Sequence, residues 1–211
     1  MELIYVLICM IVGYGFGCFQ SAYIIGRLHH IDIREYGSGN AGTTNALRTL
    51  GKGAALATFL GDALKGMIAV WLIRFVFAPM IPDMNPTFLS LVTGFFAVLG
   101  HNFPFFLHFK GGKGIATTAA ITMAIDWRMG IISLIIFVGI CATTRYVSVA
   151  SMLLLIAFPI TLTVFHREEQ GYGWMLCIAC CYTVLGIYRH RANIERLRNG
   201  TENRLGEKKK V

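Results

Sequence analysis

Residues 3–26 read LIYVLICMIVGYGFGCFQSAYIIG, a run of 24 residues without a charged side chain. A helix needs about 20 predominantly apolar residues to cross a bilayer, so this stretch predicts a membrane span. Its amino-terminal flank carries Glu2 and no Lys or Arg, which favours a retained first helix over a signal peptide. Hydrophobic residues make up 55% of the chain and charged residues only 14%. The sequence therefore predicts an all-α integral membrane protein.

Further apolar stretches of near-spanning length follow: residues 53–80, 84–109, 114–125, 130–144, 146–166 and 170–188. The first of these also contains Asp62, Lys65 and Arg74. The stretches 114–125 and 130–144 have only 12 and 15 residues, so the shorter one could be a tilted or re-entrant helix. We expect about seven transmembrane helices.

The distribution of positive charge predicts the orientation, because Lys and Arg favour cytoplasmic flanks. With seven spans and the N-terminus outside, 15 of the 19 Lys and Arg residues fall in the inner segments 27–52, 108–113, 145 and 189–211. We therefore expect a single multi-pass membrane domain over residues 1–211, with a cytoplasmic C-terminus and glycine-rich cytoplasmic loops. The basic tail, 189–211, is expected to lie against anionic lipid, which explains the net charge of +8 without nucleic acid.

The first glycine-rich stretch, residues 36–48, reads YGSGNAGTTNALR. Glycine lets backbone N–H groups approach a ligand closely, and arginine binds phosphate oxygens through two parallel hydrogen bonds. The candidate phosphate ligands in this stretch are Gly37, Ser38, Gly39, Asn40, Asn45 and Arg48. The alternative is an ordinary polar loop between two helices.

The second glycine-rich stretch, Lys110-Gly111-Gly112-Lys113-Gly114, opens a predicted helix. Free N–H groups at a helix N-terminus and two lysines favour an anion site. The G-x-x-x-x-G-K-[ST] spacing of nucleotide-binding P-loops is absent from this stretch, so ATP-driven chemistry is not expected. The alternative is an interfacial anchor whose lysines extend towards the headgroups.

Several further polar residues lie in or beside the apolar stretches. Lys65 follows Asp62 by three residues, so the two either neutralise each other or Lys65 adds positive charge near a phosphate. His101 and His190 are candidate hydrogen-bond donors or general bases, and Asn193 shares a helix face with the latter. Ser148 and Ser151 could donate to a phosphate or cap a helix.

Other chemistries lack their residue patterns. The two serines lie outside any G-x-S-x-G sequence, which excludes the usual serine-hydrolase arrangement. For Cys177 and Cys180 we expect a packing role rather than a metal or redox pair. We expect neither a metal nor another cofactor.

Together these motifs resemble those of the bacterial acyl-phosphate-dependent glycerol-3-phosphate acyltransferases. The resemblance runs from about residue 13 to residue 207 and rests on G-S-G-N-x-G-x-T-N at 37–45, G-D-x-x-K-G at 61–66, G-H-x-F at 100–103, F-K-G-G-K-G at 109–114 and H-R-x-N-I-x-R-L at 190–197. It implies a seven-helix enzyme of the bacterial cell membrane, with its N-terminus outside and its active site facing the cytoplasm.

The resemblance also implies the reaction. A fatty acyl group would pass from acyl phosphate to the sn-1 hydroxyl of glycerol 3-phosphate, giving lysophosphatidic acid and inorganic phosphate in the first step of bacterial phospholipid synthesis. It assigns phosphate contacts to Ser38 and Arg48, and it makes Lys113 part of the family's third motif. It also places Ser151, His190 and Asn193 along the site. Which of Ser148 and Ser151 contacts substrate stays open.

The chemistry suits these residue types, because an acyl phosphate is already activated and needs charge neutralisation and positioning more than a protein nucleophile. We assign catalysis to Ser38, Arg48, Lys113 and His190, and substrate binding to the other candidates. No histidine is followed five residues later by aspartate, which argues against acyl-CoA or acyl carrier protein as donor. The alternatives are a transporter of phosphate esters, for which repeats are lacking, and a scaffold that binds anionic lipid.

Overall fold

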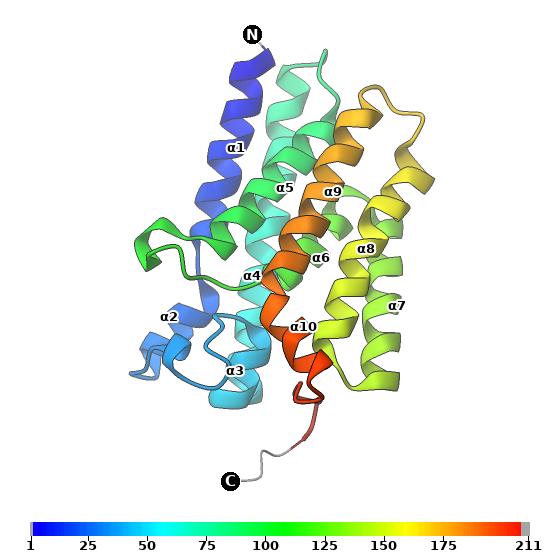
Figure 1. Ribbon diagram of the computed structural model, residues 1–211. Coiled ribbons are helices and arrows are strands. Elements are labelled where there is room, and N and C mark those ends of the chain that lie inside the picture. The colour runs from blue at the N-terminus through cyan, green and yellow to red at the C-terminus, as the bar shows by residue number, and fades with distance from the viewer. Residues whose placement is uncertain (1, 208–211) are drawn as a thin grey trace. The chain divides into compact units, whose positions relative to one another are not determined.

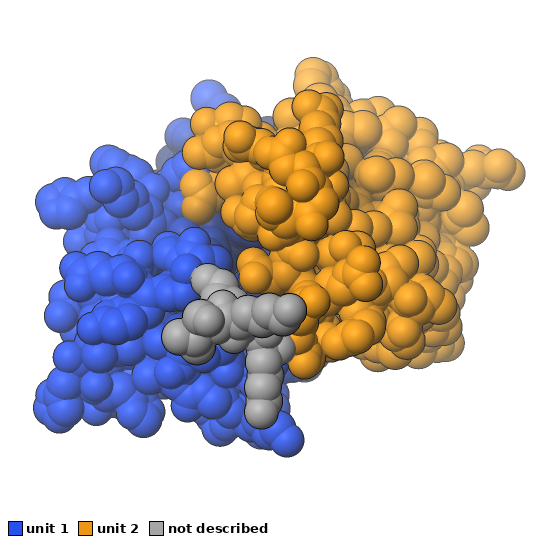
Figure 2. Space-filling model, turned by 60° about the horizontal axis from the view of Figure 1, so that its bottom comes forward, with its two compact units in different colours: residues 1–125 blue, residues 126–211 orange. Residues whose placement is uncertain are grey.

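The computed structural model describes residues 2–207, and these residues form helices and connecting loops without a strand. The chain divides into two compact units, Met1–Ile125 and Asp126–Val211, which Figure 2 shows in different colours.

Unit 1 contains six α-helices and four short helical turns among its described residues. They are α1 (Glu2–Cys18), α2 (Ser21–Leu28), η1 (Ile33–Glu35), α3 (Thr43–Thr49), α4 (Lys52–Leu72), η2 (Ile73–Phe77), η3 (Ala78–Met80), α5 (Pro86–Asn102), η4 (Phe105–Leu107) and α6 (Ile115–Ile125). Within this unit α1 packs along α5, and α4 packs against α6. Helices α2 and α3 lie at the opposite end of the unit from the start of α1 (Figure 1).

Unit 2 contains α7 (Trp127–Thr144), α8 (Val147–His166), α9 (Tyr172–Arg189) and α10 (Arg191–Arg198). Helix α8 packs against both α7 and α9, as Figure 1 shows. The short α10 follows α9 directly and confirms that Asn193, which was expected to share a helix face with His190, lies in a helix. Residues 208–211 of that tail lie outside the described residues.

Five of the described helical segments are long and apolar enough to cross a membrane: Glu2–Leu28, Lys52–Met80, Pro86–Leu107, Trp127–Thr144 and Val147–His166. Helix α6 is apolar but has only 11 residues. The stretch that looked short, 130–144, is lengthened because Asp126 caps the helix by accepting a hydrogen bond from the N–H of Arg128 at 2.9 Å. The described residues therefore contain five candidate membrane spans by length and composition.

The first predicted span is not one continuous helix. It breaks at Phe19 and Gln20, between α1 and α2. The Phe19 carbonyl accepts a hydrogen bond from Lys65 Nζ at 2.5 Å, and Gln20 Nε2 donates to the carbonyls of Gly100 and His101 at 3.4 and 3.1 Å. These partners lie 46 or more residues away, so the apolar pattern of the stretch could not reveal the break.

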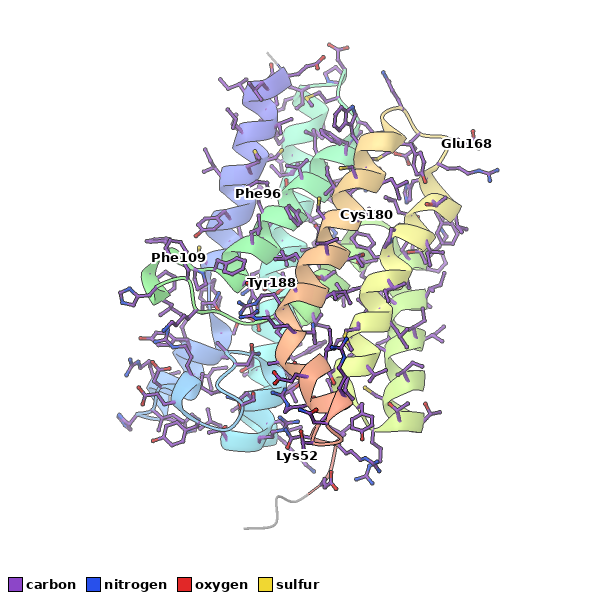
Figure 3. The ribbon with its side chains drawn as sticks, in the orientation of Figure 1. Lys52, Phe96, Phe109, Glu168, Cys180 and Tyr188 are labelled. Carbon is purple, nitrogen blue, oxygen red and sulfur yellow. The ribbon has the colours of Figure 1, made fainter. Side chains whose placement is uncertain are left out.

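The cysteines on α9 also differ from expectation. Cys177 and Cys180 are exposed, as is Cys181, rather than packed within the unit; Figure 3 labels Cys180 on this helix. Within residues 2–207, no cluster of three or more His, Cys, Asp or Glu side chains could hold a metal ion.

Close packing of α1 against α5 depends on small residues. A Cβ atom at Gly13 would overlap the Thr93 backbone, and one at Gly17 would overlap the Ala97 backbone. Such spacing of small residues lets the backbones of two membrane helices approach closely. A side chain at either position would push the helices apart.

We therefore expect Gly17→Val to destabilise the protein, because overpacking a tight contact costs about 1–3 kcal/mol or more. The matched control is Gly15→Val on the same helix, where a Cβ meets no atom within 4 Å. Thermal unfolding in detergent measures both variants. Equal losses of thermal stability in the two would contradict the packing role of Gly17.

Candidate active site

The first glycine-rich segment is folded around the side chain of Asn45, which is 1% exposed. Its Nδ2 donates to the carbonyls of Ile33 and Tyr36, both at 3.0 Å. Its Oδ1 accepts from the backbone N–H of Ser38 at 2.8 Å and lies 3.2 Å from the Ser38 hydroxyl. Asn45, predicted as a phosphate ligand, thus uses its amide to shape the segment that presents Ser38.

The turns of this segment require glycine at two positions. Gly37 and Gly39 have φ values of +62° and +70°, a left-handed conformation that is costly for other residues. A Cβ at Gly37 would also overlap the Asn45 amide. The segment exposes Ser38, and Arg48 is exposed in the last turn of α3.

Asp32 anchors the approach to this segment. It accepts hydrogen bonds from the Arg34 backbone at 3.0 Å and from the Arg34 guanidinium at 2.6 and 2.9 Å. The side-chain hydrogen bonds from Arg34 lower the pKa of Asp32 to about 2. Arg34 Nη1 also donates to the Leu107 carbonyl at 3.3 Å, which ties the first glycine-rich segment to the connection between α5 and α6.

The second glycine-rich segment, Lys110–Gly114, closes the C-terminal end of α5. The N–H groups of Gly111 and Gly112 donate to the carbonyls of Asn102 and His101, both at 3.1 Å. The last carbonyls of a helix lack partners within the helix and need such donors. We expected these two N–H groups to face a phosphate, but the structure uses them to cap α5.

The two glycine-rich segments meet at Gly112. A Cβ there would overlap the imidazole of His101 and would lie 2.5 Å from the carbonyl oxygen of Ala41, inside the first segment. Lys113 is half-buried beside this point, and Lys110 is exposed. Phe109, just before the loop, is also exposed (Figure 3). Unit 1 therefore brings the two predicted anion-binding segments together.

A buried polar cluster lies behind the loop. Asp62, Lys65 and His101 are 2, 4 and 3% exposed. Lys65 Nζ lies 3.1 Å from Asp62 Oδ1 and 2.7 Å from His101 Nδ1, besides its contact with the Phe19 carbonyl. An ammonium group has three hydrogens, so these three acceptors match all of them. Neither Lys65 nor His101 is an exposed phosphate ligand in this arrangement.

An apolar groove of about 560 Å³ runs along α1 and α4 beside this cluster. It is lined by Gly15, Phe16, Phe19, Gly61, Leu64, Lys65 and Ile68. The ammonium of Lys65 is engaged by the buried cluster. The groove therefore offers hydrocarbon contacts and no free anion-binding group.

In unit 2, His190 is buried at the junction of α9 and α10. Its Nδ1 lies 2.7 Å from the Gly186 carbonyl oxygen. Because a carbonyl only accepts hydrogen bonds, Nδ1 carries a hydrogen, and in the neutral ring Nε2 is the basic nitrogen. The geometry thus leaves Nε2 as the hydrogen-bond acceptor of the neutral His190 ring.

Glu202 joins two predicted site residues of unit 2. Its Oε1 accepts from Ser148 Oγ at 3.0 Å and from Asn193 Nδ2 at 2.7 Å, and its Oε2 accepts from Arg196 Nε at 2.7 Å. Glu202 was not among the predicted site residues, because its only signal in the sequence is a carboxylate within a basic tail. Ser151 instead donates to the Val147 carbonyl of its own helix at 2.7 Å, so Ser148 and not Ser151 belongs to this cluster.

The Glu202 cluster predicts a pH dependence of stability. Burial alone would raise the pKa of Glu202, but hydrogen bonds from Asn193, Arg196 and Ser148 lower it below the ordinary value of 4.5. A carboxyl group whose pKa is lowered by folding stabilises the fold above its unfolded pKa and loses that contribution as the pH falls through its folded pKa.

Glu202→Gln should therefore lower the thermal unfolding midpoint at pH 7, because glutamine cannot accept from all three donors as a carboxylate does. The difference from the wild type should shrink below about pH 4.5. Unfolding midpoints measured from pH 7 to pH 3 provide the test. A difference that stays constant over this range would show that the ionised carboxylate is not the stabilising species.

Comparison with known proteins agrees with this set of motifs. The glycerol-3-phosphate acyltransferase family model matches residues 7–200. A glycerol-3-phosphate acyltransferase of Alkaliphilus metalliredigens is 42% identical over 207 residues, covering 97% of this chain and 98% of that protein. One from Clostridioides difficile is 40% identical over 214 residues, covering 99% of this chain and all of the relative.

Solved structures agree as well. The crystal structure of PlsY (YgiH), an integral membrane glycerol 3-phosphate acyltransferase, in its glycerol 3-phosphate form has a TM-score of 0.84 and 35% sequence identity, covering 95% of this chain and 96% of that one. Its lysophosphatidic acid form has a TM-score of 0.81 at the same identity, covering 95% of both chains. The chain belongs to the glycerol-3-phosphate acyltransferase family.

Proposed function

We propose that this acyltransferase transfers a fatty acyl group from acyl phosphate to the sn-1 hydroxyl of glycerol 3-phosphate, producing lysophosphatidic acid and inorganic phosphate. The observation that carries the proposal is the contact of Gly112 with Ala41 and His101, which brings the two glycine-rich segments together in unit 1. Family membership supports the acceptor, and the reaction would be the first step of bacterial phospholipid synthesis.

The substrates carry phosphate groups, and the proposed site offers cations and donors to hold them. Arg48 and Lys113 would neutralise phosphate charge and Ser38 would donate a hydrogen bond, which is how preorganised sites stabilise a developing anion. We propose that five further residues contact the substrates: Asn40, Lys110, Gly114, Ser148 and Asn193. The two segments are shaped by Gly37, Gly39, Asn45, Gly111 and Gly112. Ser151 is a weaker candidate for a substrate contact, because its hydroxyl donates a hydrogen bond within α8.

The reaction needs no protein nucleophile in this proposal. The sn-1 hydroxyl oxygen attacks the acyl carbonyl carbon, the bond between that carbon and the phosphate oxygen breaks, and phosphate leaves with the electron pair. The hydroxyl proton passes to the substrate phosphate, assisted by the basic Nε2 of His190. Positioning and charge neutralisation supply the rate enhancement, and no metal or other cofactor takes part.

We further infer seven spans, with the N-terminus outside and the active site facing the cytoplasm of a bacterial cell. This count of seven consists of the five long apolar segments together with α6 and the 18-residue α9. The concentration of Lys and Arg in segments that would then be internal supports this count. The basic tail would contact anionic lipid. A transporter of phosphate esters is disfavoured, because the relatives are acyltransferases.

The direct test is release of inorganic phosphate from palmitoyl phosphate by the purified protein, without CoA or metal. We expect release that depends on glycerol 3-phosphate, persists in a chelator, and falls about 10²-fold or more in Arg48→Ala, because one charge-stabilising donor is lost. Arg198→Ala, at an exposed position of α10, is the matched control. Absence of release from folded wild-type protein would refute the reaction.

His190→Ala tests the proton step separately. We expect kcat to fall by about 10²-fold, the lower range for general acid–base catalysis, while glycerol 3-phosphate still binds. Binding by calorimetry and kcat by phosphate release distinguish the two effects. A variant that keeps most of the wild-type kcat would eliminate His190 as the assisting base.

A further inference from the structure

The ammonium of Lys65 determines which nitrogen of the His101 ring carries a hydrogen. Because Lys65 Nζ lies 2.7 Å from Nδ1 and can only donate, the neutral ring carries its hydrogen on Nε2. That nitrogen is the ring atom closest to Gly112, since a Cβ at Gly112 would overlap it. Lys65 therefore fixes the orientation of the His101 ring on one side, and the glycine-rich loop packs against the ring on the other side.

Asp62 in turn fixes Lys65. Its Oδ1 lies 3.1 Å from Lys65 Nζ and accepts a hydrogen bond from the Ser21 hydroxyl at 3.0 Å. The Asp62 carbonyl accepts from the hydroxyl of Thr117 on α6 at 2.9 Å. The cluster thus connects α2, α4, α5 and α6 through hydrogen bonds at one point behind the loop.

Net stability is a weak explanation for this cluster. Removing two charges from water costs several kcal/mol per ion, so apolar residues of similar volume often stabilise a fold as well as a buried ion pair does. What apolar residues could not supply is a directional contact to His101 Nδ1. The residue types of Asp62 and Lys65 therefore fit a role in fixing the orientation of the His101 ring.

We propose that Asp62 and Lys65 are positioning residues: they hold the His101 ring against Gly112 and thereby hold the loop that presents Lys113 to the glycerol 3-phosphate phosphate. The proposal rests on the proposed function for its substrate, whereas the positioning itself can be measured without catalysis. It gives Lys65 and His101 a role through the loop rather than by direct contact with phosphate.

The test compares two neutral double variants, Asp62→Asn/Lys65→Met and Asp62→Asn/Lys65→Gln. Both remove the ion pair, and they differ in whether the side chain at position 65 can donate to His101 Nδ1. Arg74→Met is the control, because Arg74 continues the same helical segment but donates to the Ile125 carbonyl at 3.0 Å. The readouts are hydrogen–deuterium exchange of residues 108–116, the KM for glycerol 3-phosphate, and kcat.

We expect the methionine variant to exchange faster across the loop and to raise KM about tenfold, equivalent to about 1.4 kcal/mol, with a much smaller change in kcat. The glutamine variant should recover part of both effects, and Arg74→Met should show neither. If the loop exchange and the KM of the methionine variant equalled those of Arg74→Met, the proposal would be overturned. If wild type and Arg74→Met both lack phosphate release, the proposed function fails, while the exchange data still decide the positioning.

His101→Gln covers the case in which the double variants do not fold. It leaves the Asp62–Lys65 ion pair in place and offers Lys65 an acceptor, but it removes the ring from Gly112. The same faster loop exchange and raised KM are expected with a smaller loss of thermal stability. Wild-type loop exchange in this folded variant would contradict the proposal.

Discussion

The need of the carbonyl groups at the C-terminal end of α5 for hydrogen-bond donors from outside the helix is the constraint on which the rest of unit 1 depends. His101 and Asn102 receive their hydrogen bonds from the loop amides of Gly112 and Gly111, and Gln20 supplies a further donor from the break between α1 and α2. Buried carbonyls without donors would cost about 1–3 kcal/mol each. Satisfying them fixes both the break in the first span and the path of the second glycine-rich segment.

The same constraint explains the residue types near the loop. Gly111 and Gly112 must approach α5 so closely that no side chain fits, and His101 fills the space behind them. The first segment then reaches the same point through the Ala41 carbonyl. In unit 2 a carboxylate has the organising role, because Glu202 gathers donors from α8 and α10. Hydrogen bonding to groups far apart in sequence therefore shapes the glycine-rich segments of unit 1 and the Glu202 cluster of unit 2, each within its own unit.

Much of this could be predicted from sequence, because apolar runs and glycine-rich motifs are local signals. The five long apolar segments and the helix after His190 follow from them, whereas the meeting of the two glycine-rich segments at Gly112 was not predicted. The break at Phe19, the amide direction at Gly111 and the role of Glu202 depend on partners distant in the chain. Asn45 is similar: its residue type suggested a ligand, whereas its four polar contacts, with Ser38, Ile33 and Tyr36, show that it folds the segment.

The central claim is that close backbone contact at Gly112 assembles the phosphate-binding region. Gly112→Ala tests it directly, with Gly53→Ala, where a Cβ meets no atom within 4 Å, as the control. The measurement is the KM for glycerol 3-phosphate in the phosphate-release assay. The account predicts a KM raised about tenfold or more for Gly112→Ala, equivalent to at least about 1.4 kcal/mol, and a wild-type value for Gly53→Ala. A wild-type KM in folded Gly112→Ala protein would contradict it.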